Sequence, residues 1–170
     1  TQCPALTGQV YSIAAVTDAT TYTWTVPVGW TITAGTGTTS ITVTTGTAGQ
    51  NGNITVTAGN SCGTSAASSL AVTVNPGTPA IPGAITGTAT QCPALTGQIY
   101  SIVAVADATT YTWTVPVGWT ITAGAGTNSI TVTTGGSGQN GNITVTAGNS
   151  CGTSSASSLA VTVSPGIPAI

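Results

Sequence analysis

Apolar and polar residues alternate along several short segments of the chain. Alternation with a period of two places one set of side chains on each face of a β-strand. One face of these segments is built of Trp, Ile, Val and Tyr, and the other is almost entirely Thr. The clearest segments are residues 22–26, 30–34, 41–44 and 54–58, with further strands expected at residues 10–16 and 70–74. No segment has the period of a helix, so the pattern predicts an all-β protein.

The same pattern returns after an offset of 89 residues. Residues 1–81 recur as residues 90–170 with ten positions changed, all between small or similar residues. Near-identical tandem copies indicate a repeated building unit. Residues 82–89 introduce the second copy and supply its expected first strand, which gives seven strands per unit. We therefore expect a section of a longer array, in which the first strand of the first copy is missing.

The repeat sets the expected domain boundaries. The first sandwich is expected at residues 1–75 and the second at residues 84–164. Between them, residues 76–83 contain a proline at every third position, which favours an extended and fairly stiff connector. Residues 165–170 are expected to begin the next connector.

Short alternating strands about ten residues apart, in a unit of about 85 residues, are typical of an immunoglobulin-like sandwich. We therefore expect tandem seven-stranded antiparallel sandwiches arranged head to tail. Trp24 and Trp113 lie on the expected central strand and are predicted to anchor the two cores. The dipeptides Asn51-Gly52 and Asn140-Gly141 favour type I′ hairpin turns.

Charged residues are almost absent from the composition. The chain has no Lys, Arg or His, and its two carboxylate side chains give a net charge of −2. General acid–base catalysis uses His or paired carboxylates, and phosphate binding relies on Lys and Arg. We therefore expect no catalytic residue, no cofactor and no nucleic-acid partner. No apolar run approaches the roughly 18 residues of a membrane helix, so membrane insertion is not expected either.

The two carboxylates, Asp18 and Asp107, occupy equivalent positions in the sequence Asp-Ala-Thr-Thr-Tyr. Calcium takes six or more oxygen ligands, usually from several carboxylates. One Asp per unit instead favours a turn residue, and no metal site is predicted.

Four cysteines, Cys3, Cys62, Cys92 and Cys151, leave three possible disulfide connectivities. One hypothesis pairs Cys3 with Cys62 and Cys92 with Cys151 inside each unit. In a seven-stranded sandwich, however, these positions fall at opposite poles, roughly 25 Å apart. A bridge requires Cα atoms within about 7 Å. In a head-to-tail array Cys3 would instead meet Cys151, and we favour this bridge slightly while both arrangements stay open.

Trp30 and Trp119 follow a Val-Gly pair in the sequence Val-Gly-Trp-Thr-Ile. Of the four tryptophans they are the ones expected to be partly exposed, where a flat ring beside Gln50 and Asn51 could contact a carbohydrate. The competing interpretation, which we prefer, packs these rings against the core or a neighbouring unit.

Several motifs together resemble a known family. The segments Tyr-Ser-Ile, Tyr-Thr-Trp-Thr-Val-Pro and Gly-Asn-Ile-Thr-Val-Thr-Ala-Gly-Asn-Ser-Cys-Gly-Thr-Ser occur in both copies. They resemble the PKD-like, immunoglobulin-fold repeats of large secreted surface proteins of Bacteroidetes. The resemblance implies an extracellular location and roles in adhesins, gliding-motility filaments or modules attached to secreted hydrolases. Such repeats commonly carry Lys, Asp and Glu, which are replaced here by Thr, Ser, Ala and Gly.

Two functions follow as expectations. The first is a structural stalk or filament repeat of a cell-surface adhesin, which spaces a binding tip from the cell. The second is a carbohydrate- or surface-binding module of a secreted hydrolase. Neighbouring repeats of the same chain are the expected partners. Lateral association into fibres is a further possibility, because Lys residues that normally protect edge strands are absent.

Overall fold

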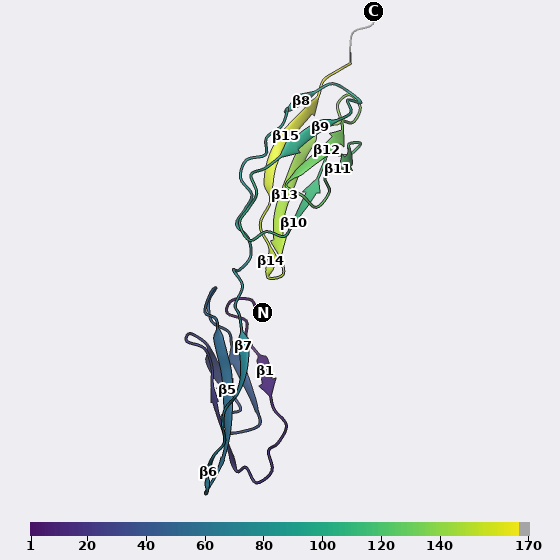
Figure 1. Ribbon diagram of the computed structural model, residues 1–170. Coiled ribbons are helices and arrows are strands. Elements are labelled where there is room, and N and C mark those ends of the chain that lie inside the picture. Colours follow the sequence, from purple (N-terminus) through teal and green to yellow (C-terminus); the bar gives the residue numbers. More distant parts are fainter. Residues whose placement is uncertain (167–170) are drawn as a thin grey trace, which may run out of the picture. The chain divides into compact units, whose positions relative to one another are not determined.

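The computed structural model describes residues 1–166 and divides the chain into two compact units. Unit 1 is Thr1–Gly77 and unit 2 is Thr78–Ile170. Within the described residues both units are built of strands and turns without helices, which confirms the all-β fold (Figure 1). Most of the second connector expected at residues 165–170 lies outside the described residues.

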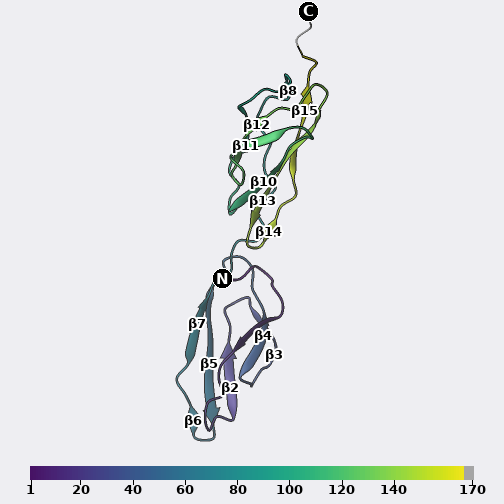
Figure 2. The same cartoon turned by 90° about the vertical axis from the view of Figure 1, so that its right-hand side faces the viewer.

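Unit 1 is a sandwich of two sheets. One sheet has the order β1-β4-β3, and in the other β5 is flanked by β2 and by β6 and β7. All of these pairs are antiparallel, and Figure 2 shows β2, β5 and β7 side by side. The strands are β1 Gln9–Ser12, β2 Thr21–Thr25, β3 Thr31–Ala34, β4 Ser40–Thr44, β5 Gly52–Asn60, β6 Gly63–Thr64 and β7 Ser68–Val72.

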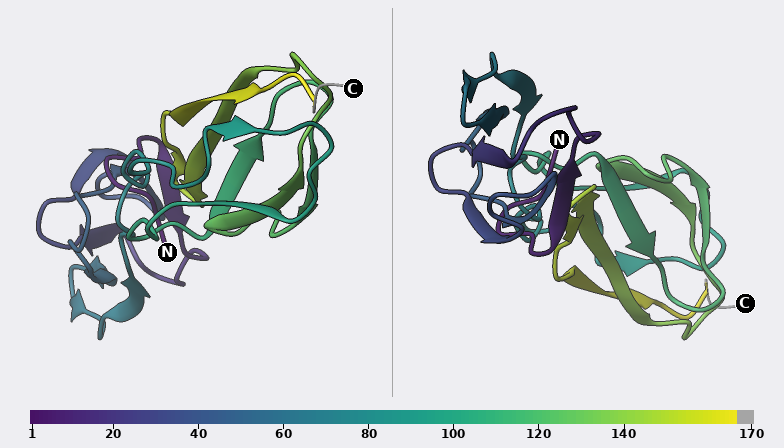
Figure 3. Two further views of the ribbon diagram at one scale, coloured as in Figure 1. Left: turned by 90° about the horizontal axis from the view of Figure 1, so that it is seen from above. Right: turned by 90° about the horizontal axis from the view of Figure 1, so that it is seen from below.

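Unit 2 repeats this arrangement and adds one short strand. Its sheets have the orders β11-β12-β9 and β10-β13-β15-β8, with β14 paired to β13; they form the two layers seen end-on in Figure 3. The strands are β8 Thr90–Gln91, β9 Gln98–Ser101, β10 Thr110–Thr114, β11 Thr120–Ala123, β12 Ser129–Thr133, β13 Gly141–Asn149, β14 Gly152–Thr153 and β15 Ser157–Val163.

The first strand of unit 2 differs from the expectation. Residues 84–89 do not form a regular strand but make a single antiparallel bridge between Thr86 and Ser101 of β9. The chain then crosses to the other sheet, where β8 pairs with β15 in parallel. The sandwich is therefore not wholly antiparallel, and unit 1 has the same parallel pairing as an isolated bridge between Gln2 and Val74.

The two cores follow from the alternation. In β4 and β12 the Ile and Val side chains are buried, while the Thr side chains between them are half-buried. Trp113 is buried in the core of unit 2 and Trp24 packs, partly buried, against that of unit 1, so both anchor their cores as predicted. Their indole Nε1–H groups donate to Thr127 and Thr38 carbonyl oxygens, each at 2.8 Å.

The type I′ turns predicted at Asn51-Gly52 and Asn140-Gly141 are absent. Such a turn requires positive φ at both central residues, and none of these four residues has a positive φ. The positive φ lies two residues earlier, at Gly49 (77°) and Gly138 (76°). Asn51 instead uses its side chain, whose Oδ1 accepts from Val74 N–H at 2.7 Å. This bond ties the start of β5 to the end of the chain segment that follows β7.

Candidate functional site

The loops that carry the cysteines, at the ends of each sandwich, are held by side-chain hydrogen bonds to the backbone. The first is the loop that carries Cys3. Thr45 is buried beneath it, and its hydroxyl donates to Cys3 O and accepts from Leu6 N–H, both at 2.8 Å. Ala5 has a φ of 52°, a conformation that non-glycine residues seldom adopt. One buried hydroxyl therefore fixes the shape of the loop.

Unit 2 repeats this loop around Cys92. Thr134 is buried, donates to Cys92 O at 2.8 Å and accepts from Leu95 N–H at 2.8 Å. Ala94 has a φ of 55°. The Cys92 thiol itself is exposed and free.

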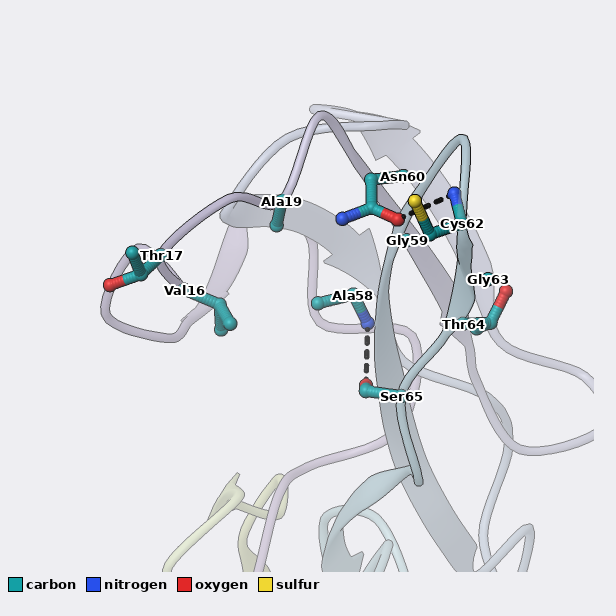
Figure 4. A pocket seen from close by; sticks show the side chains of 10 residues that line it. All are labelled: Val16, Thr17, Ala19, Ala58, Gly59, Asn60, Cys62, Gly63, Thr64 and Ser65. Atoms are coloured by element: carbon teal, nitrogen blue, oxygen red, sulfur yellow. Dashed lines mark hydrogen bonds between the residues drawn. The ribbon is translucent and has the colours of Figure 1, made fainter.

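The opposite pole of unit 1 carries Cys62 on the turn between β5 and β6. Asn60 Oδ1 accepts from Cys62 N–H at 2.9 Å, and Asn60 Nδ2 donates to Asp18 O at 3.0 Å. The side chain of Asn60 thus joins this turn to the loop between β1 and β2. Between that loop and the hairpin lies a cavity of about 340 Å³, lined by residues 16, 17 and 19 of the loop and by residues 58–60 and 62–65 of the hairpin (Figure 4). Cys62 is exposed and free beside it.

The two cysteines of unit 1 are held at opposite ends of β5. Gln2 and Asn51 place the Cys3 loop at the start of this nine-residue strand, and Cys62 follows its end. Nine extended residues span roughly 25–30 Å, far beyond the reach of a disulfide. Together with the free state of Cys62 and Cys92, this rules out the two bridges within units.

Asp18 and Asp107 act through their backbone. Their φ angles are 63° and 62°, in the left-handed region that Asp tolerates better than most residues. Each main-chain oxygen accepts from an Asn side chain, Asn60 in unit 1 and Asn149 in unit 2. Among the described residues no cluster of three or more His, Cys, Asp or Glu is positioned to hold a metal ion.

Trp30 and Trp119 pack into the cores, as the preferred interpretation predicted, and the alternative of partly exposed contacts is wrong. Both are buried, with 6% of each side chain exposed. The indole N–H of Trp30 donates to Gln50 O and that of Trp119 to Gln139 O, each at 2.9 Å. The rings pack at a tilt against Tyr11 and Tyr100, with centroids 6.4 and 6.2 Å apart. No flat aromatic platform is therefore available at these positions.

The Gln50 amide, considered above as a sugar contact, is also used internally. Its Oε1 accepts from Thr47 N–H at 2.7 Å. A Cβ built at Gly29 or Gly46 would lie within 2.3 Å of this side chain, so a larger residue at either position would displace the Gln50 amide. The Gln therefore closes the loop around Trp30.

Residues of the expected connector belong to the fold of unit 2. Thr78 Oγ1 donates to Cys151 O at 3.4 Å, and Ser157 Oγ donates to Gly83 O at 3.0 Å. Pro79 and Pro82 are buried. This stretch therefore lies against its own sandwich.

Thr45, Asn60 and their counterparts were missed by sequence reasoning. Thr45 is one Thr among many, and only its position one residue past a buried strand distinguishes it. Asn60 precedes a Ser-Cys-Gly turn, where an Asx-type bond to the backbone two residues on is a recognisable signal.

The fold and its recurring local motifs are those of a defined class of immunoglobulin-like module. A sequence profile of the PKD-like domain matches residues 1–72 and 78–161, so the chain belongs to this family and contains two of its domains. No curated protein sequence matches the chain significantly. In the described residues, no helix has the length and apolar character needed to cross a membrane.

Solved structures show the same fold at low sequence identity. The titin I-band fragment I67–I69 is 16% identical with a TM-score of 0.53, and the match covers 92% of this chain and 60% of the fragment. A variant of the same titin domains is 15% identical with a TM-score of 0.52 over the same shares. Extracellular domains 3–5 of Drosophila OTK are 17% identical with a TM-score of 0.47, covering 79% of this chain and 50% of theirs. The chain thus spans about three fifths of the titin fragments.

Proposed function

We propose that the chain is part of the stalk of a long extracellular adhesin or filament, in which repeats hold a binding tip away from the cell. The observation that carries this proposal is the fixed start of unit 2. Residues 78–83, which link the repeats, are hydrogen-bonded to the sandwich at Cys151 and Ser157 and bury two prolines. Because these linking residues are bonded to unit 2, few residues between the repeats are free to extend under force. This property suits a spacer that carries tension.

The composition of the surface supports the same role. The exposed strand faces are rich in Thr and Ser, and the chain carries a net charge of −2 with no Lys, Arg or His. Every buried side-chain N and O atom among the described residues has a hydrogen-bond partner. Together with the resemblance to surface proteins of Bacteroidetes, these features favour a secreted and structurally closed module.

The proposal includes a covalent link between repeats. The length of β5 and the free thiols of Cys62 and Cys92 argue against bridges within each unit. We assign Cys3 to a bridge with Cys151, and Cys62 and Cys92 to equivalent bridges with the repeats on either side. Each pair of neighbouring repeats would then be joined by a disulfide bond as well as by the main chain.

Pulling a single full chain from its two ends tests both the stalk and the bridge. With a Cys3–Cys151 bridge, most of the chain is shielded from force, and little extension is expected without reductant. After reduction, the same chain should release roughly 500 Å, at up to about 3.5 Å per residue. The Cys62→Ser and Cys92→Ser double variant is the matched control and should behave like the parent. Full release without reductant would contradict the bridge.

The stalk itself is tested by measuring the length of arrays with two, four and eight repeats by small-angle scattering. A spacer predicts a maximum dimension that rises in proportion to the number of repeats. Arrays that collapse or bend back, so that their maximum dimension levels off, would exclude it. The burial of Trp30 and Trp119 removes the aromatic contacts proposed for the binding-module alternative and so favours the stalk.

A further inference from the structure

The sequence Ile-Thr-Val-Thr occurs four times in the chain. Each occurrence lies in a six-residue window that contains no charged residue, proline or glycine. We call these windows the ITVT segments; they are residues 40–45, 53–58, 129–134 and 142–147. Uncharged segments of this length, rich in β-branched residues and free of proline, have the composition that favours stacking into cross-β assemblies.

The fold places every ITVT segment on a central strand. β4 lies between β1 and β3, and β12 lies between β9 and β11. β5 pairs with β2 and β7, and β13 pairs with β10 and β15. Neighbouring strands therefore cover the segments on both sides while the sandwich is folded.

The apolar faces of these segments already pack against each other in the folded units. Ile41 and Val43 of β4 belong to one core cluster with Ile54 of β5, and the equivalent residues of β12 and β13 share the core of unit 2. Two sheets that meet dry through interdigitated Ile and Val side chains, about 10 Å apart, are also the arrangement of a steric zipper. The native core thus shows that these faces fit one another.

The threonine faces are also suited to stacking. Thr25 and Thr55 lie directly opposite each other on β2 and β5, and their hydroxyl groups are hydrogen-bonded. Thr114 and Thr144 repeat this bond in unit 2. Threonines stacked at the strand spacing of about 4.8 Å can therefore satisfy one another's hydroxyl groups.

No charge or proline opposes such stacking once a sandwich has opened. Asp18 and Asp107 lie on exposed turns outside the strands. Residues 28–75 and 117–164 contain neither a charged residue nor a proline. Charged residues and prolines beside apolar strands are the usual protection against pairing between unfolded chains. In this chain the native fold itself provides that protection.

We propose that the ITVT segments are self-assembly sites. When a sandwich opens, they pair in register with the same segments of a second copy of this chain and form a cross-β fibre. Register pairing of identical segments stacks Ile on Ile and Thr on Thr, which keeps the apolar face continuous. This assembly differs from lateral association of folded repeats through edge strands, and it does not depend on the function of the array.

The test uses the full 170-residue chain with reductant, held at the midpoint of its thermal unfolding. We expect fibres whose X-ray diffraction has reflections at about 4.8 Å and about 10 Å. Hydrogen exchange of the fibres should place the protected amides in the ITVT segments. A chain that stays monomeric, that aggregates without these reflections, or that is protected elsewhere would overturn the proposal.

Two matched charge variants make the test specific, each held at its own unfolding midpoint. The first places one carboxylate in every segment: Thr42→Glu, Thr57→Glu, Thr131→Glu and Thr146→Glu. Stacking in register brings these like charges directly over one another, so fibres should form at least about tenfold more slowly than from the parent chain.

The control adds the same four charges to strands outside the segments: Thr23→Glu, Thr31→Glu, Thr112→Glu and Thr120→Glu. All four positions are exposed in the folded chain, and this variant should assemble like the parent. Because assembly starts from the opened chain, a loss of native stability does not hide the result. Equal inhibition in the two variants, or inhibition in neither, would contradict the assignment of the ITVT segments.

Discussion

Unit 1 and unit 2 share their core residues position by position, yet they bury them to different extents. Ala147 and Val145 of unit 2 are fully buried, whereas their counterparts Ala58 and Val56 are 8% and 4% exposed. The difference is largest where residues 78–88 cover unit 2. The core residues are the same, so the deeper burial in unit 2 comes from the cover that residues 78–88, the covering segment, provide.

The boundaries of the repeat differ according to whether sequence identity or packing defines them. By sequence identity the copies are residues 1–81 and 90–170. By packing, the complete module of unit 2 begins near Thr78 and ends at β15. The unit that recurs in sequence is thus shifted against the unit that buries a core, because the segment between the copies completes the sandwich that follows it.

The largest expected effect comes from blocking this segment in unit 2. Gly87→Val in the full chain forces a side chain into the Tyr100 ring and should destabilise unit 2 by about 3 kcal/mol. Unit 1 should be unaffected, because Gly87 packs on Tyr100 of unit 2. Thermal unfolding combined with hydrogen exchange of peptides from β10 and β13 measures the loss.

Gly83→Ala is the control for this variant. The position has open space and lies on the same segment, so its stability should change by no more than about 0.5 kcal/mol. If both variants leave the exchange of β13 unchanged, the covering segment contributes nothing to the stability of unit 2.

A smaller effect is expected where the units are alike. Thr45→Val and Thr134→Val remove a buried hydroxyl and leave two backbone groups of the cysteine loop without their partner. Each should lower stability by about 2 kcal/mol, equally in the two units. Denaturant unfolding measures the loss, and Thr→Ser at either position, which keeps the hydroxyl, should recover most of it. Unequal losses of stability in the two units would show that residues 78–88 also stabilise the Cys92 loop of unit 2.

Alternation predicted the central strands well because their neighbours bury one face only. The segments at residues 41–44 and 54–58 fall within β4 and β5, and their Ile and Val side chains are buried. The first strand of unit 2 was predicted less well. Residues 84–89 contain one buried apolar residue, Ile85, before the chain crosses between sheets at Gly87, so the alternation cannot continue.

The site was harder to predict than the fold. The sequence left Trp30 between partial exposure and packing, with packing preferred, but it did not predict the bond to the Gln50 backbone that holds the ring in the core. This bond joins residues 20 positions apart, so no local sequence pattern predicts it. The positions of Cys3 and Cys62 at opposite poles, by contrast, follow from strand order and length, and the structure places them there.

The smallest expected effect is a pH dependence specific to unit 2. Burial raises the pKa of Tyr100, since the phenolate loses its hydration, and the hydrogen bond from Gln91 offsets part of this rise. Below about pH 10 the phenol is protonated in both the folded and the unfolded chain, so its contribution to stability is fully present. Above pH 10 the unfolded chain ionises first, and the stability of unit 2 should fall until the folded pKa is passed.

Tyr100→Phe removes the ionisable group and should flatten the alkaline loss of unit 2, while lowering its stability at neutral pH through the lost bond to Thr88. Urea unfolding at a series of pH values above 9 separates the slope from this constant offset. Tyr11→Phe is the matched variant in unit 1, where the ring is only partly buried. An alkaline slope that survives Tyr100→Phe unchanged would mean that the covering segment does not seal this phenol from water.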